Sequence, residues 1–356
     1  MVTIKDIART LGVSVGTVSK ALNGRDDVGD ELRARIIDTA RELRYEPDPI
    51  ARRLVTKRSR TLGVFMLDRQ GFGVRRNFGW LFLDGILRGA AARDYDLVLF
   101  SNTDDTRYER SYIDICRSRR VDAAIIVGLR GDDRYLEDVL NAPIPVALID
   151  TEVSGGTATF VSSDNKAGAA LALEHLAFLG HEKVATLRAP FSYPGRLRYE
   201  AWAEFAAARG RYRDDYIRDG DFTPESGMAA AAAFASMKDM PTAIFAASDL
   251  MAIGLIRGFE RLGVRVPEDV SIVGFDDIPN ADLVGPALTT VAQDTLGIGQ
   301  AALDAVLDEL DSGSRREEIL VAPRLVVRRS CAAPGGAPDF LTEGSPAASL
   351  GVRRTP

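Results

Sequence analysis

Residues 3–23 read TIKDIARTLGVSVGTVSKALN, and this stretch has the pattern of two short helices joined by a tight turn. The apolar residues of the first helix recur at i, i+3, i+4 and i+7 and therefore line one stripe: Ile4, Ile7, Ala8 and Leu11. Thr3 and Asp6 are spaced as a capping box, and Gly12 is placed to end the helix. The spacing predicts two helices that dock on each other.

Ser14 can cap the second predicted helix. Apolar residues of this helix, among them Val18 and Ala21, must pack back on the first one. The side chains left available to face outward are Val15, Gly16, Thr17, Ser19, Lys20 and Asn23. A second helix that presents its N-terminal residues to the major groove is the arrangement of helix-turn-helix DNA-binding proteins. An ordinary helical hairpin is the alternative.

A third helix is predicted over 29–43, because Leu32, Ile36, Ala40 and Leu43 share one face. It would close a small core with the first two helices. Such a unit buries little apolar surface and should be only marginally stable alone.

The length of 356 residues suggests two or three domains, and the mean hydropathy of -0.05 is that of a soluble globular protein. No run of about 18 apolar residues and no secretory signal is present, so we expect a cytoplasmic protein that does not bind membranes. Two cysteines, Cys116 and Cys331, and two histidines form neither a disulfide framework nor a zinc pattern. We expect reduced thiols, no metal and no cofactor.

Charge is unevenly distributed along the chain. Residues 1–60 carry 13 Lys and Arg against 9 Asp and Glu, whereas the rest of the chain carries 32 against 42. A basic head on an acidic body fits a protein that brings one end to a polyanion.

The linker that follows the third helix contains Pro47 and Pro49, which forbid a helix through them. Asp48 and Pro49 can start a short helix over 50–57, which carries basic residues and no acid. Such a helix is marginal by itself because its like charges repel, and it should order when phosphates neutralise it. The linker is a candidate coupling element between head and body.

From Thr61 onward, apolar runs alternate with amphipathic helices. The expected strands are 62–67, 96–100, 123–127, 146–149, 159–162, 183–187, 243–246 and 270–273, and the expected helices are 80–93, 107–119, 166–179, 198–209, 224–237 and 250–262. Alternating βαβα units imply doubly wound α/β layers, with ligands near the carboxyl ends of the strands. Two successive series suggest two lobes with a cleft between them. Residues 331–356 are expected to form a disordered tail.

Several separated motifs resemble the LacI/GalR family of bacterial transcriptional regulators. They are TIKDIARTLGVSVGTVSKALN (3–23), YEPDPIARRL (45–54), VSSDNKAGAALALEHLAFLGHEKVA (161–185), SDLMAIGLIRGFERLGVRVPEDVSIVGFDDIP (248–279) and PALTTVAQD (286–294). The resemblance covers the chain to about residue 330.

The resemblance implies an all-α helix-turn-helix headpiece and a two-lobed α/β core like a periplasmic binding protein. The implied boundaries are 1–46 for the headpiece, 47–60 for a hinge helix, and 61–330 for the effector-binding and dimerisation core. Within the core, the N-lobe is expected at about 61–160 plus 291–320 and the C-lobe at about 161–290 plus 321–330. The family works as a homodimer on a palindromic operator.

Carried over residue by residue, the family's base-reading positions fall on Val15, Gly16 and Lys20. Lys20 could donate to guanine, whereas Val15 offers only apolar contact. Thr3, Ser14, Thr17, Ser19 and Asn23 are expected to contact the DNA backbone. In the hinge, Leu54, flanked by Ala51 and Arg53, matches the leucine that wedges between base pairs in the minor groove. A core leucine is the alternative for Leu54.

The positions that ring the effector in the family are implied at Phe78, Asp150, Phe191, Arg198, Ser248, Asp249, Asp276 and Gln293. Carboxylates and a guanidinium suit the hydroxyls of a sugar, while an aromatic side chain (Phe78, Trp80 or Phe191) would stack on its apolar face. As alternatives, Asp249 and Asp277 could be helix caps, and Trp202 could belong to the core. The effector is expected to be a sugar or oligosaccharide.

An enzyme is considered because Ser163-Asp164-Asn165-Lys166 contains the SDN and SxxK strings of penicillin-recognising enzymes. The two strings overlap here and no KTG follows, so we interpret the match as coincidence. A cytoplasmic solute receptor without DNA binding, a regulator of a non-sugar metabolite and an architectural DNA protein remain as alternatives. The combination of head, hinge and cleft favours an effector-responsive repressor of carbohydrate uptake or catabolism genes, and not an enzyme.

Overall fold

The computed structural model describes residues 2–22, 27–45, 58–67, 78–102, 110–151 and 155–335. The chain divides into two compact units, Met1–Arg60 and Thr61–Pro356. In the described ranges, no helix is long and apolar enough to cross a membrane.

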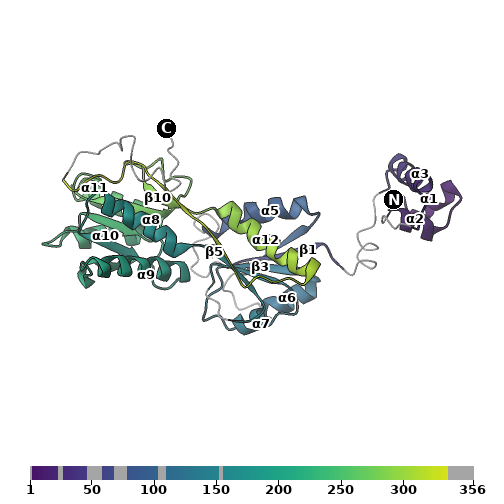
Figure 1. The fold of residues 1–356 in the computed structure, drawn as a ribbon, viewed down its shortest axis with the longest axis horizontal. Helices are drawn as coiled ribbons and strands as arrows, with labels where there is room; N and C mark the ends of the chain where they lie inside the picture. The colour runs from purple at the N-terminus through teal and green to yellow at the C-terminus, as the bar shows by residue number, and fades with distance from the viewer. Residues whose placement is uncertain are drawn as a thin grey trace. The chain divides into compact units, whose positions relative to one another are not determined.

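The first unit consists of α1 (Ile4–Leu11), α2 (Val15–Leu22) and α3 (Asp30–Glu42), as the sequence predicts (Figure 1). One face of each helix contributes to a shared core: Ile7, Ala8, Val18, Ala21, Val28, Ile36 and Ala40. Gly12 ends α1 with φ +65°, a left-handed conformation that glycine adopts without the steric cost of a Cβ atom. The turn between α1 and α2 is thereby held to three residues.

The first sheet of the second unit is wholly parallel, with the order β11-β5-β4-β3-β1-β2. Its strands are β1 (Thr61–Leu67), β2 (Asp96–Asn102), β3 (Ala123–Val127), β4 (Val146–Ile149), β5 (Thr159–Ser163) and β11 (Glu318–Val321). Alternate residues of β1 face opposite layers, with Val64 packed towards α5 (Phe82–Ala92) and α12 (Thr295–Ser312), and Phe65 towards α6 (Tyr112–Arg119). The short helices η1 (Phe78–Leu81) and α7 (Leu136–Leu140) complete this lobe.

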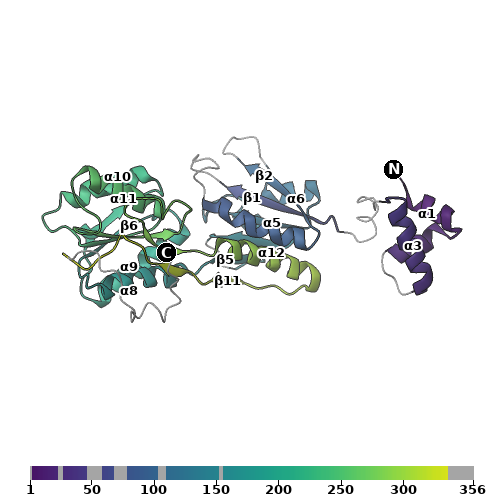
Figure 2. The ribbon, with the colours of Figure 1, turned by 90° about the horizontal axis from the view of Figure 1, so that it is seen from above.

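The second sheet has the order β12-β10-β9-β8-β6-β7, and only β12 runs antiparallel to its neighbour. Its strands are β6 (Val184–Arg188), β7 (Ile217–Asp219), β8 (Ala243–Ala246), β9 (Ser271–Asp276), β10 (Thr289–Ala292) and β12 (Arg324–Val326). Helices cover both faces (Figure 2): α8 (Asn165–Phe178), α9 (Tyr193–Ala208), α10 (Pro224–Ala235) and α11 (Asp249–Arg261), with η2 at Asp214–Tyr216. The two-lobed α/β class expected from the sequence is confirmed.

The chain passes between the two sheets three times. It leaves the first sheet after β5, returns after β10 through α12 to β11, and leaves again to form β12. These passages fall within a few residues of the lobe boundaries expected from the sequence, which remain a proposal.

Ordered packing continues beyond residue 330. Cys331 and Ala332 are buried, and the Ala332 N–H donates to Ser271 Oγ at 3.0 Å. Cys116 and Cys331 are both free, and burial raises the pKa of each thiol to about 12. Residues 336–356 of the expected tail lie outside the described residues.

Helices α10 and α11 approach each other closely because glycines face each other across the contact. A Cβ atom on Gly254 would lie 2.1 Å from the Pro224 carbonyl oxygen, and one on Gly227 would lie 2.2 Å from the Met251 carbonyl oxygen. Neither position has room for a methyl group unless the helices separate.

We therefore expect Gly254→Ala to destabilise the second unit by about 1–3 kcal/mol, since it forces two packed backbones apart. Thermal unfolding of the full chain measures this. Gly29→Ser is the matched control, because a Cβ atom there meets nothing within 4 Å and lies in the first unit. An unchanged unfolding temperature for Gly254→Ala would show that the helices can separate at no cost.

Candidate functional site

The N-terminal end of α2 presents the residues expected to meet DNA. Val15 has 38% of its surface exposed, and Gly16 is exposed beside it. Ser14 Oγ accepts a hydrogen bond from the Thr17 N–H at 3.0 Å, and the two hydroxyl oxygens lie 2.8 Å apart. Ser14 therefore caps the helix while remaining at the surface, where a phosphate can reach it.

Lys20 lies one turn further along α2 and is about half exposed. Its ammonium group forms an ion pair with the Asp27 carboxylate. Exposed ion pairs of this kind contribute roughly 0–1 kcal/mol, so a DNA group can displace Asp27 at little cost. Ser19 is partly buried next to Lys20.

Thr3 starts α1, and both its N–H and its hydroxyl donate to Asp6 Oδ2, at 2.9 and 2.8 Å. This pairing with the residue three positions on is the one that the capping-box spacing predicts. The remaining residues expected to contact DNA lie outside the described residues: Asn23, Ala51, Arg53 and Leu54.

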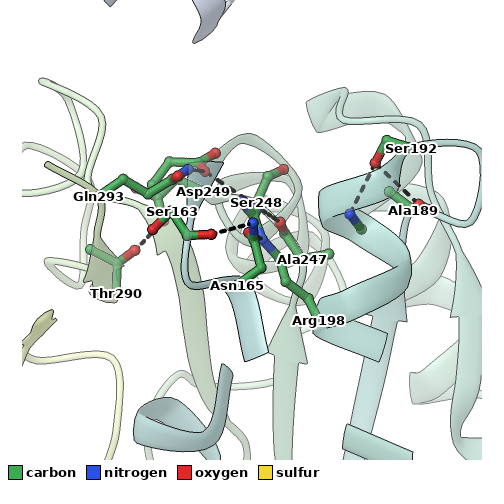
Figure 3. A network of polar contacts seen from close by, with 12 residues as sticks. Ser163, Asn165, Ala189, Ser192, Arg198, Ala247, Ser248, Asp249, Thr290 and Gln293 are labelled. Atoms are coloured by element: carbon green, nitrogen blue, oxygen red, sulfur yellow. Dashed lines mark hydrogen bonds and ion pairs between the residues drawn. The ribbon is translucent and has the colours of Figure 1, made fainter. Parts of the chain in front are cut away.

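In the second unit, Arg198 of α9 is the centre of a buried polar network (Figure 3). Its Nε donates to Asn165 Oδ1 at 2.8 Å, and one terminal nitrogen donates to the Ala247 carbonyl oxygen at 2.6 Å. The same nitrogen lies 3.4 Å from Asp276 Oδ1. The guanidinium also lies over the Phe275 ring, 3.6 Å from its centroid. Arg198 thus joins the start of α8 to the ends of β8 and β9.

Gln293 extends this network from the segment after β10. Its Nε2 donates to Asp276 Oδ1 at 2.8 Å, so the same carboxylate oxygen serves both Arg198 and Gln293. Asp276 ends β9 with φ +124°, an unusual backbone conformation for a residue with a side chain. Such a conformation is often found at functional sites.

Asp150 joins the network from the first sheet, directly after β4. Its carboxylate accepts a hydrogen bond from Ser162 Oγ at 2.6 Å and interacts electrostatically with Arg198. Asn165 Nδ2 donates to Ser162 Oγ at 3.1 Å and to the Ser163 carbonyl oxygen at 2.9 Å. Side chains from both sheets therefore meet where the chain first passes between them.

Burial changes the acidity of these groups. Burial is the largest influence on Asp276 and raises the pKa of its carboxyl to about 7, although Arg198 acts in the opposite direction. The pKa of Asp150 is also raised by burial, against the hydrogen bond from Ser162. Burial lowers the pKa of Arg198, whereas the carboxylates around it raise it. The cost of desolvation thus exceeds the gain from pairing, as in many buried ion pairs.

Ser248 and Asp249 are held in structural roles. Ser248 caps α11 by accepting from the Met251 N–H at 3.3 Å. Asp249 is fully buried, and its two oxygens accept from Thr290 Oγ1 at 2.5 Å and from the Ile278 N–H at 2.9 Å. Asp249 braces the loop after β9 against β10. It is not the helix cap offered as its alternative, because Ser248 caps α11.

The aromatic residues considered for stacking on a ligand lie in different parts of the second unit. Phe191 is partly buried and packs edge-on against Phe222, with ring centroids 5.4 Å apart. Trp202 is fully buried, and its indole N–H donates to the Val184 carbonyl oxygen at 3.2 Å, so it belongs to the core. Trp80 packs against the first lobe's core. Phe78 begins η1, and its side chain lies outside the described residues.

Sequence reasoning missed Asn165 as a site residue, although it accepts the central hydrogen bond from Arg198. The available signal was its position in the short connection between the predicted strand 159–162 and the predicted helix 166–179. A position of that kind is shared by other residues of the network.

The raised pKa of Asp276 gives a pH dependence with a definite sign. Between its ordinary value of 3.8 and about 7, the folded chain keeps a proton that the unfolded chain has released, so Asp276 contributes less stability as the pH rises. We expect the unfolding free energy of the wild type, minus that of Asp276→Asn, to fall from about pH 5 to about pH 8. Denaturant titrations at each pH measure it.

Asp239→Asn is the control for this prediction. Lys183 and Arg213 hold the pKa of Asp239 at about 2, so its stabilising contribution is lost only under more acidic conditions. The unfolding free energy of the wild type, minus that of Asp239→Asn, should not change between about pH 5 and about pH 8. A flat difference for Asp276→Asn as well would show that its carboxyl is ionised throughout.

Comparisons with known proteins place these features in a family. The model of bacterial regulatory proteins of the lacI family matches residues 3–48, and that of a periplasmic binding protein-like domain matches residues 173–331. The HTH-type transcriptional repressors PurR of Serratia proteamaculans (strain 568) and of Erwinia tasmaniensis (strain DSM 17950 / CFBP 7177 / CIP 109463 / NCPPB 4357 / Et1/99) are 31% and 32% identical to the chain. Each alignment covers 93% of this chain and 97% of the relative.

Two solved structures are similar over nearly the whole chain. The lac repressor dimer bound to operator and the anti-inducer ONPF has a TM-score of 0.75 and 27% identity, covering 93% of this chain and 99% of that one. The complex of the transcriptional regulator CelR with cellobiose has a TM-score of 0.70 and 27% identity, covering 93% and 100%. These relatives are regulators and not enzymes, so the SDNK string marks no penicillin chemistry. The chain belongs to the lacI family of bacterial regulatory proteins, and it is a DNA-binding transcriptional repressor that responds to a small-molecule effector.

Proposed function

We propose that the protein represses genes of carbohydrate uptake or catabolism in the cytoplasm, as a homodimer on a palindromic operator. The Arg198 network is the main support for the effector response in this proposal, because polar side chains of both lobes meet there. A ligand held there has differential contacts in different lobe arrangements, which is the requirement for coupling to DNA affinity, typically ~1 to 3 kcal/mol.

Relatives with sugar ligands support the carbohydrate class. One is the CelR–cellobiose complex, and another is a LacI family regulator from Enterococcus faecium with bound ribose, which is 26% identical with a TM-score of 0.65 and covers 77% of this chain and 99% of that one. The relatives named PurR are described as transcriptional repressors without a stated ligand, so a non-sugar metabolite is the second class to test.

For the DNA, we propose base reading by Lys20 and apolar contact by Val15. Both side chains are exposed on α2, and the Lys20 ammonium forms a surface ion pair with Asp27. Ser14 and Thr17 would fix the register of α2 through phosphates. The dimer follows from operator symmetry, since a palindrome matches two identical heads.

Lys20→Ala should relax sequence preference at a single base pair of each half-site, by about 1–3 kcal/mol, because one base-edge contact is lost. Binding to a set of operator variants, each with one base pair changed, measures this. Lys5→Ala in α1 is the matched loss of charge and should leave the preference unchanged. A uniform loss across all sequences for Lys20→Ala would make Lys20 a phosphate contact instead.

Leu54→Ala should weaken specific operator binding while the core keeps its ligand affinity, because a minor-groove wedge contributes only to the bent complex. Electrophoretic binding assays and DNA-bending assays measure the operator complex, and calorimetric titration with the small molecule measures the ligand affinity. Val55→Ala, the adjacent truncation, is the control. Unchanged operator affinity in Leu54→Ala would exclude the wedge.

A further inference from the structure

Ser163 Oγ and Gln293 Oε1 are two of the six buried side-chain atoms of the second unit that have no hydrogen-bond partner among the described residues. The other four belong to His175, Thr186, Glu309 and Arg328. Only 1% of Ser163 and 7% of Gln293 is exposed to solvent. An unsatisfied buried polar atom costs about 1–3 kcal/mol, so such atoms are rare unless something else satisfies them. Both residues belong to segments that the Arg198 network connects, as Figure 3 shows.

The hydrogen bonds already made define what each atom can still do. Gln293 uses its amide nitrogen on Asp276, which leaves Oε1 as an acceptor only. The Ser163 hydroxyl has no hydrogen-bond partner among the described residues, so it can both donate and accept. A molecule that satisfies both atoms must therefore offer a donor to Gln293.

The charges around the network restrict that molecule further. Arg198 interacts electrostatically with three carboxyl groups, those of Asp276, Asp150 and Asp249. Burial raises the pKa of all three carboxyl groups, although Arg198 acts in the opposite direction on Asp150 and Asp276 and Arg328 does so on Asp249, so the site already disfavours negative charge. An added phosphate or carboxylate would meet the same repulsion in a buried place where screening by water is weak.

We propose that Ser163 and Gln293 select an uncharged effector that presents a hydroxyl or N–H donor to Gln293 and a second polar group to Ser163, and that the site rejects phosphorylated or carboxylated compounds. The assignment rests on the proposed effector response and adds Ser163 as a specificity-determining residue. Sugars and nucleobases both satisfy the donor requirement, while their phosphate esters do not satisfy the charge requirement.

The first test uses matched pairs of compounds on the full-length protein. Thermal shift and isothermal titration compare glucose with glucose 6-phosphate, ribose with ribose 5-phosphate, and adenosine with its 5′-monophosphate, alongside cellobiose, other neutral sugars, adenine and guanine. At least one uncharged compound should bind, and its phosphorylated counterpart should bind at least tenfold more weakly. A phosphorylated compound that binds as tightly as its neutral partner overturns the proposal, and so does a panel in which no uncharged compound binds.

The second test uses a matched pair of variants with the uncharged compound that binds. Ser163→Ala should weaken its binding about fivefold, since one hydrogen bond is lost. Thr186→Val is the control, because Thr186 Oγ1 is another buried hydroxyl without a partner among the described residues but lies inside β6, outside the network. The affinity of the Thr186→Val variant for the same compound should stay within about twofold of that of the wild type.

Ser163→Cys, which keeps a weak donor in place of the hydroxyl, provides a second readout should the alanine variant not fold, and intermediate affinity is expected. Wild-type affinity in either Ser163 variant, or an equal loss in Thr186→Val, removes Ser163 from the site.

Operator binding measured on the same samples separates this inference from the proposed function. Compound selectivity without any palindrome preference would retain the selection by Ser163 and Gln293 and reject the repressor proposal. Operator binding together with selectivity for anionic compounds would retain the repressor proposal and reject the selection by Ser163 and Gln293.

Discussion

The guanidinium of Arg198 connects parts of the chain that belong to both lobes, and we propose that the response to an effector depends on it. It contacts Asn165 at the start of α8, the Ala247 carbonyl at the end of β8 and Asp276 at the end of β9. Asp150, from the other sheet, lies within its electrostatic reach. Because a planar guanidinium bonds in fixed directions, these segments cannot shift independently without breaking a buried hydrogen bond. A ligand that competes for any one partner therefore acts on the others.

The DNA-facing half of the protein has the opposite physical character. The headpiece rests on a small core around Ile36, and the residues that face DNA are held by surface contacts such as the Lys20–Asp27 ion pair. Breaking an exposed ion pair costs little free energy, so DNA can replace such contacts easily. Breaking a buried hydrogen-bonded ion pair costs much more free energy. The molecule thus combines an exposed surface on the headpiece, whose contacts are easily exchanged, with a buried polar network in the core. A buried network of this kind can transmit an allosteric change if it has a second arrangement.

The sequence predicts the headpiece and the buried strands well, because runs such as Ala123–Val127 are apolar throughout and Gly12 has an evident conformational role. The hydrophobic pattern alone does not predict the return of α12 and β11 to the first sheet, since Glu318–Val321 is half exposed and carries no buried-strand pattern. Only the family resemblance places residues 291–320 in the N-lobe. In the site, residue identity indicates Arg198, Asp276 and Gln293 as polar groups. The sequence cannot distinguish Asp249, which holds the loop after β9, from Asp276, which pairs with Arg198, because both roles require a buried carboxylate. The three-dimensional structure is needed to distinguish them.

The central claim is that the Arg198 network couples the effector site to the operator, and Arg198→Lys tests it most directly. Lysine keeps the positive charge for Asp276 but cannot bond Asn165 and Ala247 in fixed directions at the same time. The measurement is the operator dissociation constant of the full chain with and without saturating ligand, beside the wild type. We expect the variant to bind the operator with near wild-type affinity in the absence of ligand. Saturating ligand should change its operator dissociation constant by a factor close to one. A full ligand response in Arg198→Lys would contradict it.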